Sequence, residues 1–265
     1  MVFVNHFSPF LFSVQIGGQP IGLRWYGLAY VLGFVLGYLS LRRAAQRNRV
    51  PGLGQDALDR LIFALIIGVV GGGRLGYVLQ NPGQLMRDPM FALRIWEGGM
   101  AFFGGLAGVL LAVVWSARRD RLPYWPLTDA LTIPAALGLG FGRIANFINA
   151  ELWGRPTHQS WGVIYPSVDQ QLRHPAELYS SVALFVVAGL LTWLRHRWGP
   201  EAKPGLLSAM FLMAYGLSRA FTDIWREEPI AFAGMDMGQI LSLVIAAIGW
   251  GLWLRWTRTS SRPKA

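Results

Sequence analysis

The sequence predicts an all-α, polytopic integral membrane protein, because apolar stretches long enough to cross a bilayer recur along almost the whole chain. Hydrophobic residues make up 53% of the 265 residues, and only 14% are charged. The mean hydropathy is +0.37, and ordinary soluble domains carry roughly 25% charged residues. A transmembrane β-barrel would instead show alternating segments of about 10 residues, and the sequence contains none.

Seven windows reach the length of about 20 residues that a helix needs to cross the hydrocarbon core. The seven predicted transmembrane helices are Ile21–Leu41, Ala57–Leu79, Gly98–Trp115, Tyr124–Phe141, Ala176–Leu194, Gly205–Phe221 and Met237–Leu254. We expect a single transmembrane domain, residues 1–265. The aromatic-rich segment of about residues 1–20 is too short and interrupted to span, so we expect it to lie along the outer interface. The proline-containing segment of about residues 150–175 is expected to form an irregular outer arm.

The positive charge is placed unevenly along the chain, and this predicts the orientation in the membrane. Basic residues gather after the first, third, fifth and seventh predicted helices, at Arg42, Arg43, Arg47, Arg49, Arg118, Arg119, Arg121, Arg195, Arg197, Lys203, Arg255, Arg258, Arg262 and Lys264. The opposite ends carry only Arg87, Arg94, Arg155, Arg173 and Arg226. By the positive-inside rule the N-terminus lies outside and the C-terminus is cytoplasmic. The net charge of +10 is thus an orientation signal, and we expect no nucleic-acid partner.

Several enzyme classes lack their characteristic residues in this sequence. The chain has no cysteine, which excludes disulfides, thiolate catalysis by the protein and cysteine metal sites. No serine stands in a Gly-x-Ser-x-Gly context, which disfavours a lipase-like nucleophile. The four histidines show no HExxH spacing, which disfavours a metalloprotease. We expect neither a metal nor a cofactor.

The most informative segment is residues 142–154, GRIANFINAELWG, which directly follows an apolar run. Its polar residues are Arg143, Asn146, Asn149 and Glu151. Polar and ionisable residues at the end of a membrane span are costly, so they indicate a functional site.

A second arginine, Arg219, lies late in the sixth predicted helix, with Asp223 four residues further on. Such an i,i+4 pair can be purely structural. Two arginines at a similar depth, beside amides and carboxylates, predict instead a polar cavity for an anion, because the guanidinium fork suits phosphate oxygens. For a cavity that opens to lipid, the nearest anion is a phospholipid headgroup.

Glycines recur inside the second and third predicted helices, at Gly68, Gly71, Gly72, Gly73, Gly98, Gly99, Gly104, Gly105 and Gly108. One interpretation is close helix packing through small residues. The other is that the residues between Gly98 and Gly108 loosen the backbone beside a cavity. Both can hold together.

Residues 142–154 resemble the signature segment of the bacterial phosphatidylglycerol–prolipoprotein diacylglyceryl transferase family. Further segments resemble the family in the same order over nearly the whole chain: Trp25-Tyr26-Gly27, Gly72-Gly73-Arg74-Leu75-Gly76-Tyr77, Trp96-Glu97-Gly98-Gly99-Met100, Arg173-His174-Pro175, Tyr215-Gly216-Leu217-Ser218-Arg219, Arg226-Glu227 and Met237-Gly238-Gln239-Ile240-Leu241-Ser242.

The resemblance implies a multi-pass enzyme of the bacterial inner membrane that needs no cofactor. Its reaction moves the diacylglyceryl group of phosphatidylglycerol to the lipobox cysteine thiol of a preprolipoprotein and releases glycerol phosphate. The resemblance assigns Arg143 to headgroup binding and Arg219 to the leaving phosphate, and it places Glu151 in the catalytic set. The remaining substrate-binding residues that it implies are Tyr26, Asn146, Asn149 and Asp223.

Three positions depart from the family pattern. Phe103 occupies a slot where many members have a histidine that has been considered the base for the cysteine proton. Asp223 stands where we expect glutamate, and Ala176-Glu177 replaces an expected Ser-Gln, without an expected consequence. With Phe103, either another group such as Glu151, Asp223 or a water accepts the proton, or the chain is a non-catalytic lipid- or lipoprotein-binding paralogue. An anion transporter is a third class, disfavoured because the sequence shows no internal repeat.

Overall fold

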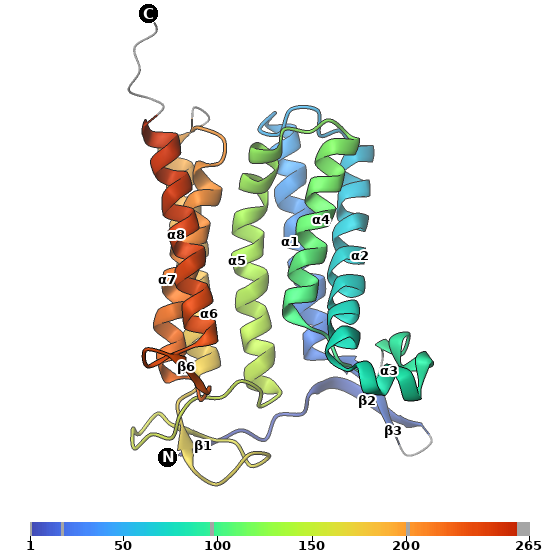
Figure 1. Ribbon diagram of the computed structural model, residues 1–265, viewed down its shortest axis with the longest axis vertical. Helices are drawn as coiled ribbons and strands as arrows, with labels where there is room; N and C mark the ends of the chain where they lie inside the picture. The colour runs from blue at the N-terminus through green and yellow to red at the C-terminus, as the bar shows by residue number, and fades with distance from the viewer. Residues whose placement is uncertain (1, 17–18, 96–97, 200–201, 259–265) are drawn as a thin grey trace, which may run out of the picture. The chain divides into compact units, whose positions relative to one another are not determined.

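A computed structural model describes residues 2–16, 19–95, 98–199 and 202–258 of the chain (Figure 1). Trp96 and Glu97 of the motif before the third predicted helix lie outside the described residues, as do the basic Arg262 and Lys264 near the C-terminus. The described chain is mostly helical. Six of its helices are long and apolar enough to cross a membrane, as expected of an all-α polytopic membrane protein.

The helices occupy the seven predicted places, with short elements between them. They are α1 (Trp25–Gln46), α2 (Gln55–Gln80), α3 (Pro82–Arg87), η1 (Pro89–Ala92), α4 (Phe102–Arg119), α5 (Tyr124–Ile148), α6 (Ala176–Trp198), α7 (Leu206–Thr222), η3 (Asp223–Trp225) and α8 (Met237–Arg258). The strands are β1 (Phe3–Val4), β2 (Phe10–Ile16), β3 (Gln19–Arg24), β4 (Val163–Ile164), β5 (Leu172–Arg173), β6 (Ile230–Phe232) and β7 (Met235–Asp236). The six candidate spans are α1, α2, α4, α5, α6 and α8, while α7 has 17 residues.

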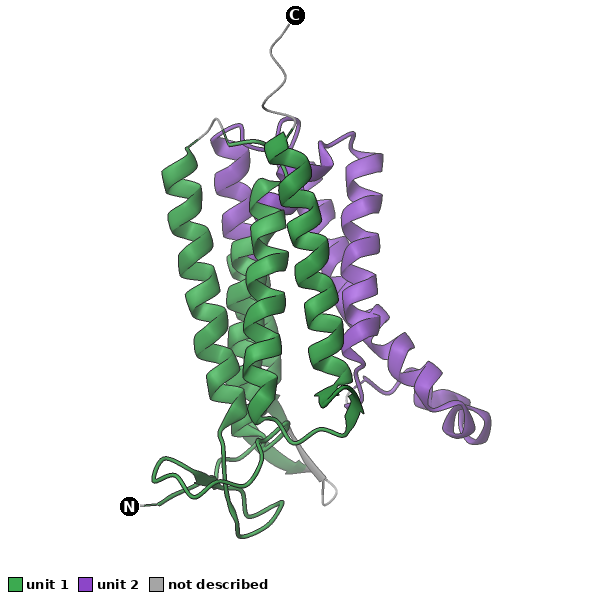
Figure 2. Ribbon diagram, turned by 60° about the vertical axis from the view of Figure 1, so that its left-hand side comes forward, with its two compact units in different colours: residues 1–36, 131–265 green, residues 37–130 purple. Residues whose placement is uncertain are grey.

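The chain divides into two compact units, which are described separately (Figure 2). Unit 1 comprises residues 1–36 and 131–265, and unit 2 comprises residues 37–130. The division falls inside α1 and α5. All the site residues predicted from the sequence belong to unit 1, whereas Phe103 belongs to unit 2.

Glycines bring α2 and α4 together in unit 2. A methyl group built on Gly72 would lie 2.4 Å from the carbonyl oxygen of Gly104, and one built on Gly68 would lie 2.5 Å from that of Gly108. Any larger side chain at these positions would push the two helices apart. The close contacts support helix packing as the role of these four glycines.

Arg74 of α2 is buried, and its charge is met by backbone carbonyl groups of unit 2. Its Nε donates to the carbonyl oxygen of Ala92 at 3.1 Å. Its Nη1 donates to Gly98 at 2.5 Å and to Gly99 at 3.0 Å, and its Nη2 donates to Phe91. One side chain therefore holds η1 and the two glycines before α4 against α2, which is a structural role.

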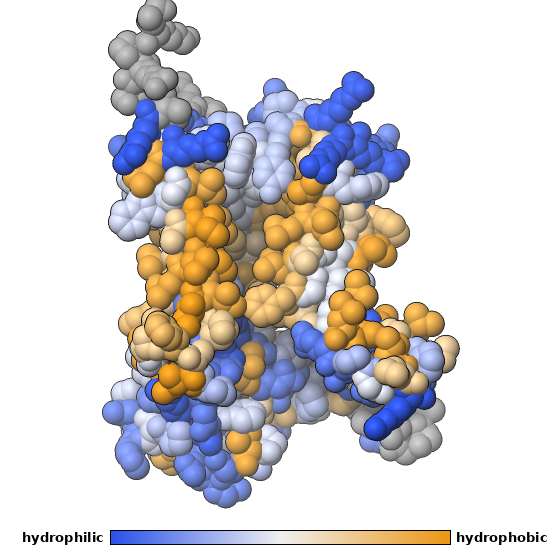
Figure 3. Space-filling view, in the orientation of Figure 1, coloured by the Kyte–Doolittle hydropathy of each residue, from blue (hydrophilic) through white to orange (hydrophobic). Residues whose placement is uncertain are grey.

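In unit 1, α6, α7 and α8 run side by side (Figure 1). Glycines again permit close approach, since a methyl group on Gly216 of α7 would lie 2.4 Å from the carbonyl oxygen of Ser242 in α8. The helices α5, α6 and α7 also share an apolar core, which is formed by Ile133, Ala136, Val187, Ala188, Leu191, Leu194 and Leu207. Over α7 and α8, apolar side chains cover the middle of the helices and hydrophilic ones gather at both ends (Figure 3), as expected of helices that cross a bilayer.

Several helix ends differ from the predicted ones, and three of these differences have a clear physical reason. The first helix was expected from Ile21, but residues 19–24 form β3, which pairs antiparallel with β2, and α1 begins at Trp25. Pro20 and the β-branched Ile21 are poor residues for a helix interior and are compatible with an edge strand. The third helix was expected from Gly98, which has a φ of 87° and precedes α4. Only glycine adopts such a value readily.

The third wrong boundary matters for the site. The fourth helix was expected to end at Phe141, but α5 continues to Ile148. Hydropathy marks where the apolar stretch ends, whereas the helix continues until its backbone changes conformation. That change occurs at Ala150, with a φ of 53°. Arg143 and Asn146 therefore lie within the last turns of α5, where the helix fixes their direction.

We expect Arg74→Met to lower the free energy of unfolding by about 3 kcal/mol or more, because hydrogen bonds to a charged group contribute on the order of 1.5–3 kcal/mol each. Thermal denaturation of the purified protein in detergent measures this. Arg87→Met, at an exposed position in α3, is the matched control and should melt like the wild type. Equal melting of the two variants would contradict the structural role of Arg74.

Candidate functional site

A polar cluster forms where the end of α5 meets the start of α1. Asn146 and Tyr26 meet directly, with the amide Nδ2 of Asn146 donating to the Tyr26 hydroxyl. That hydroxyl donates to Oε2 of Glu151 at 2.6 Å, and Oε2 also lies 3.5 Å from Nδ2 of Asn146. The structure thus brings together three of the predicted site residues. Asn149 makes no side-chain hydrogen bond to a described residue, and its Oδ1 is buried.

The end of α5 is held in place by a small core from the N-terminus and the arm. Phe147 packs with Val163 and Tyr165. Asn5 is buried, and its side-chain amide donates to the carbonyl oxygen of Phe147 at 2.6 Å. The strand β1 pairs in parallel with β4. These contacts orient the last turns of α5, and with them Arg143.

Arg219, at the end of α7, forms the predicted ion pair. Its Nε lies 3.4 Å from Oδ2 of Asp223. Asp223 is only 1% exposed, and its Oδ1 also lies 3.6 Å from Nη1 of Arg226. One buried carboxylate therefore stands between two arginines.

Arg143 and Arg219 line the same small pocket. The other lining residues come from α6 and α7 and are Ser180, Leu184, Tyr215, Ser218 and Thr222. The Arg143 guanidinium is also within electrostatic reach of Arg226. Guanidinium groups that gather in a poorly hydrated pocket repel one another, so an anion would be stabilised there.

The two pocket arginines differ in their partners. Arg219 is paired with a carboxylate, whereas Arg143 makes no hydrogen bond or ion pair to any residue within the described ranges. A guanidinium carries five N–H donors. Arg143 therefore presents its donors to whatever enters the pocket, as a ligand-binding arginine does.

Sequence reasoning did not assign a role to Glu177, which lies next to this pocket. Glu177 is the second residue of α6, is 1% exposed and is within electrostatic reach of Arg143 and Arg226. Its Oε2 accepts a hydrogen bond from the Tyr165 hydroxyl at 3.2 Å, while its Oε1 has no partner among the described residues. Burial and the Glu177 carboxylate raise the pKa of Tyr165, so its hydroxyl stays protonated and donates. The signal was present in the sequence, as a carboxylate that opens an apolar run.

The arm, residues 150–175, is tied to the segment that follows α7. Arg173 is central to this connection, because its Nη2 lies 2.6 Å from Oδ2 of Asp169 and its Nη1 donates to Glu227. The Trp153 indole nitrogen also donates to Glu227, at 3.2 Å. Arg155 Nε donates to the carbonyl oxygen of Arg226 at 2.9 Å. The arm therefore closes over one end of the helices that carry the pocket.

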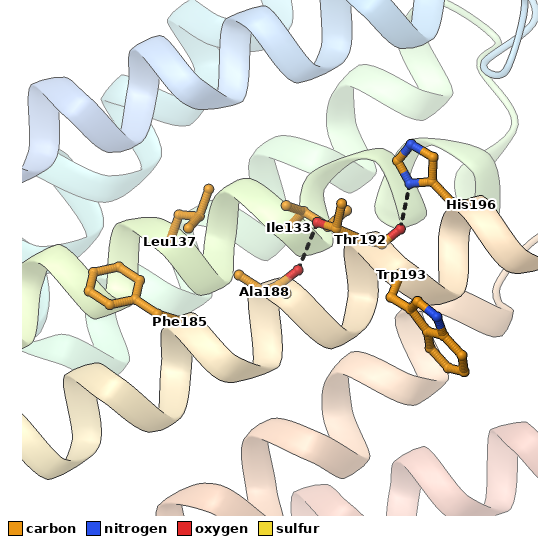
Figure 4. Close-up of a pocket in the computed structure, with 8 residues that line it drawn as sticks. Ile133, Leu137, Phe185, Ala188, Thr192, Trp193 and His196 are labelled. Atoms are coloured by element: carbon orange, nitrogen blue, oxygen red, sulfur yellow. Dashed lines mark hydrogen bonds between the residues drawn. The ribbon is translucent and has the colours of Figure 1, made fainter.

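A larger hollow lies between α5 and α6, and Figure 4 shows its lining. Its residues are mostly apolar. The Thr192 hydroxyl donates to the carbonyl oxygen of Ala188 at 2.8 Å. The Nδ1 of His196 lies 2.8 Å from the carbonyl oxygen of Thr192. The polar atoms thus turn to the helix backbone, and we assign the chemistry to the smaller arginine pocket.

The chain matches a known protein family. Residues 12–255 match the family model described as prolipoprotein diacylglyceryl transferase. The chain belongs to this family. The resemblance inferred from the sequence motifs is therefore confirmed.

Related proteins are similar over almost their whole length, and each is named phosphatidylglycerol–prolipoprotein diacylglyceryl transferase. The protein of Cereibacter sphaeroides (strain ATCC 17025) is 38% identical, and the aligned region covers 96% of this chain and 97% of that protein. The protein of Sinorhizobium medicae is 40% identical, and the aligned region covers 91% of this chain and 89% of that protein. The protein of Nitrosomonas europaea is 41% identical, and the aligned region covers 95% of this chain and 91% of that protein.

In this member of the prolipoprotein diacylglyceryl transferase family, the signature segment ends at a glycine that the fold requires. A methyl group built on Gly154 would lie 2.4 Å from the carbonyl oxygen of His174 and 2.7 Å from that of Trp225.

Phe103 is the second residue of α4 in unit 2. It is 62% exposed, and its ring meets that of Phe102 at 5.5 Å. A phenyl ring has no atom that accepts a proton.

We expect the arm to loosen in acid. The hydrogen bond from Arg173 holds the pKa of Asp169 below its ordinary value. The ion pair therefore stabilises the arm fully above the ordinary aspartate pKa of about 3.9, and this contribution is lost as the pH falls through the lowered value. The protection of residues 150–175 against hydrogen exchange, taken as the observed rate relative to the intrinsic rate at each pH, should fall in the wild type as the pH is lowered from 6 through the pKa of Asp169. Asp169→Asn should show fast exchange already at pH 6, and slow exchange there would contradict the role of the pair.

Proposed function

We propose that this chain transfers the diacylglyceryl group of phosphatidylglycerol to the lipobox cysteine thiol of preprolipoproteins. The thiol sulfur attacks the glyceryl carbon that bears the phosphate, a C–S bond forms, and the C–O bond to the phosphate breaks. Glycerol phosphate leaves, and the thiol proton passes to a base or to water. The observation that carries the proposal is the pocket shared by Arg143 and Arg219, in which the donors of Arg143 have no partner among the described residues.

The two arginines suit this chemistry in different ways. Negative charge grows on the leaving phosphate in the transition state, so a cation placed there accelerates the reaction. Arg219, oriented by Asp223, has a fixed position for that role. Arg143, which is unpaired in the described structure, binds the headgroup phosphate before and during the reaction.

The cluster of Tyr26, Asn146 and Glu151 orients the headgroup and completes the catalytic set. Among the described residues, the hydrogen bonds of this cluster leave Oε1 of Glu151 available, and this carboxylate is a candidate acceptor for the thiol proton. The side-chain oxygen of Asn149, which has no partner in the described part of the chain, can accept a hydrogen bond from the headgroup. A thiol with a pKa near 8.5 needs only modest help to ionise.

The proposal includes the membrane topology. The chain crosses the bacterial inner membrane seven times as a single transmembrane domain, with its N-terminus outside and its C-terminus in the cytoplasm. Six helices long and apolar enough to cross a membrane, together with the uneven basic residues, support this arrangement. The segment of about residues 1–20 lies along the outer interface, and the arm of about residues 150–175 faces the same side.

A turnover assay tests the function directly. Purified protein in detergent receives phosphatidylglycerol and a lipobox peptide, and mass spectrometry measures the peptide. We expect a mass gain of one diacylglyceryl group, which a peptide with serine in place of the cysteine should not show. Phe103→His is assayed in parallel. No gain with the wild type but a gain with Phe103→His would contradict the proposal and indicate a binding paralogue that has lost its base.

We expect Arg143→Ala and Arg219→Ala each to lower turnover by about 10²–10³-fold, the effect of removing one group that stabilises transition-state charge. Arg143→Ala should raise KM for phosphatidylglycerol as well, whereas Arg219→Ala should act mainly on kcat. Arg197→Ala, exposed near the other end of α6, is the matched control and should keep wild-type kinetics. Full activity in both pocket variants would remove the basis for phosphate stabilisation.

A further inference from the structure

Asp236 caps the first turn of α8, but the cap does not account for its charge. The backbone N–H of Gln239 donates to Oδ1 of Asp236 at 2.8 Å, and the N–H of Asp236 donates to Oε1 of Gln239 at 3.1 Å. This reciprocal pair is a capping box, which serine or threonine forms equally well. Asp236 is 4% exposed, and its Oδ2 has no hydrogen-bond partner among the described residues. A buried charge is costly unless something compensates it.

Arg219 is a cation within electrostatic reach of Asp236. A methyl group built on Gly238 would lie 2.9 Å from Oδ1 of Asp236, 3.0 Å from Oδ2 of Asp223 and 3.5 Å from Nη2 of Arg219. The two carboxylates and the guanidinium therefore converge above one glycine. The side-chain amide of Gln239 also donates to the carbonyl oxygen of Ala220 at 3.2 Å, which fixes the start of α8 against α7.

The hairpin before α8 brings Asp236 to this place. β6 and β7 pair antiparallel, with Ile230 opposite Asp236. The two residues of the connecting turn, Ala233 and Gly234, both have positive φ, 50° and 78°. A two-residue turn with both φ values positive matches the twist of a hairpin, so the position of Asp236 is set by backbone geometry.

We propose that Asp236 is a positioning residue for Arg219: with Asp223, it holds the guanidinium that faces the pocket. This inference rests on the proposed function, in which Arg219 stabilises the leaving phosphate. Asp223 contacts the guanidinium at Nε, 3.4 Å from its Oδ2. A second carboxylate nearby limits the motion of the guanidinium further, and a catalytic group held in place accelerates a reaction more than a mobile one.

Substitutions at Asp236 separate the cap from the charge. Asp236→Asn and Asp236→Ser both keep an acceptor for the N–H of Gln239 and remove the charge, whereas Asp236→Ala removes both. We expect Asn and Ser to lower kcat by roughly tenfold to a hundredfold, since misplacing a positioned group by about 1 Å costs on this order. KM for phosphatidylglycerol and the melting temperature should change little. Asp236→Ala should show the same loss of kcat and a lower melting temperature.

The matched control is Asp59→Asn, which removes an exposed carboxylate of α2 and should leave kcat and KM unchanged. Wild-type kcat in Asp236→Asn and Asp236→Ser, with Arg219→Ala inactive, would overturn the inference and leave the proposed function intact. A raised KM with unchanged kcat would overturn it as well. An active Arg219→Ala variant would instead remove the proposed role of Arg219, and the inference with it. If Asp236→Ala fails to fold, the Asn and Ser variants decide.

Discussion

The constraint on which unit 1 depends is the burial of several guanidinium groups where water is scarce. Arg143, Arg219 and Arg226 gather near one end of its helices, and each desolvated cation costs several kcal/mol unless it is compensated. Asp223 compensates two of them directly. The arm, the β6–β7 hairpin and the first turn of α8 all contribute groups to this balance. The loops at this end are thereby fixed by charge as well as by the small apolar core around Phe147.

The partners of each arginine indicate its role better than its depth does. Arg74 is surrounded by backbone carbonyl groups, and Arg173 is bound by two carboxylates and a carbonyl, so neither has donors to spare for a ligand. Arg219 is paired with the carboxylate of Asp223 and also lines the pocket. Arg143 alone of these four has no partner in the described residues, although the helix orients it toward a pocket. A cation in such a place is costly unless an anion compensates it, which is the reason for proposing that Arg143 binds the headgroup phosphate.

The sequence alone was sufficient for the helices, the family and the pairing of Arg219 with Asp223, because these follow from local patterns. Hydropathy reports burial in lipid, and an i,i+4 spacing places two side chains on one helix face. The sequence could not show the role of Glu177 or Asp236. Their positions depend on contacts between α6 and the arm, and on a hairpin turn, which no periodicity encodes. The extension of α5 past Phe141 was missed for the opposite reason, since a helix continues beyond the apolar run that hydropathy measures.

The same electrostatics bear on the proton that the reaction must remove. A thiol ionises more readily next to arginine, because a cation stabilises the thiolate. Among the described residues, the pocket holds Arg143 with no carboxylate bound to it, while Asp223 is engaged with Arg219 and Arg226. Under the proposed function, a cysteine that approaches Arg143 would lie beside guanidinium groups, and its proton would pass to Glu151 or to water. The proposed reaction then needs no histidine at the position of Phe103, because the cations that stabilise the leaving phosphate also favour the thiolate.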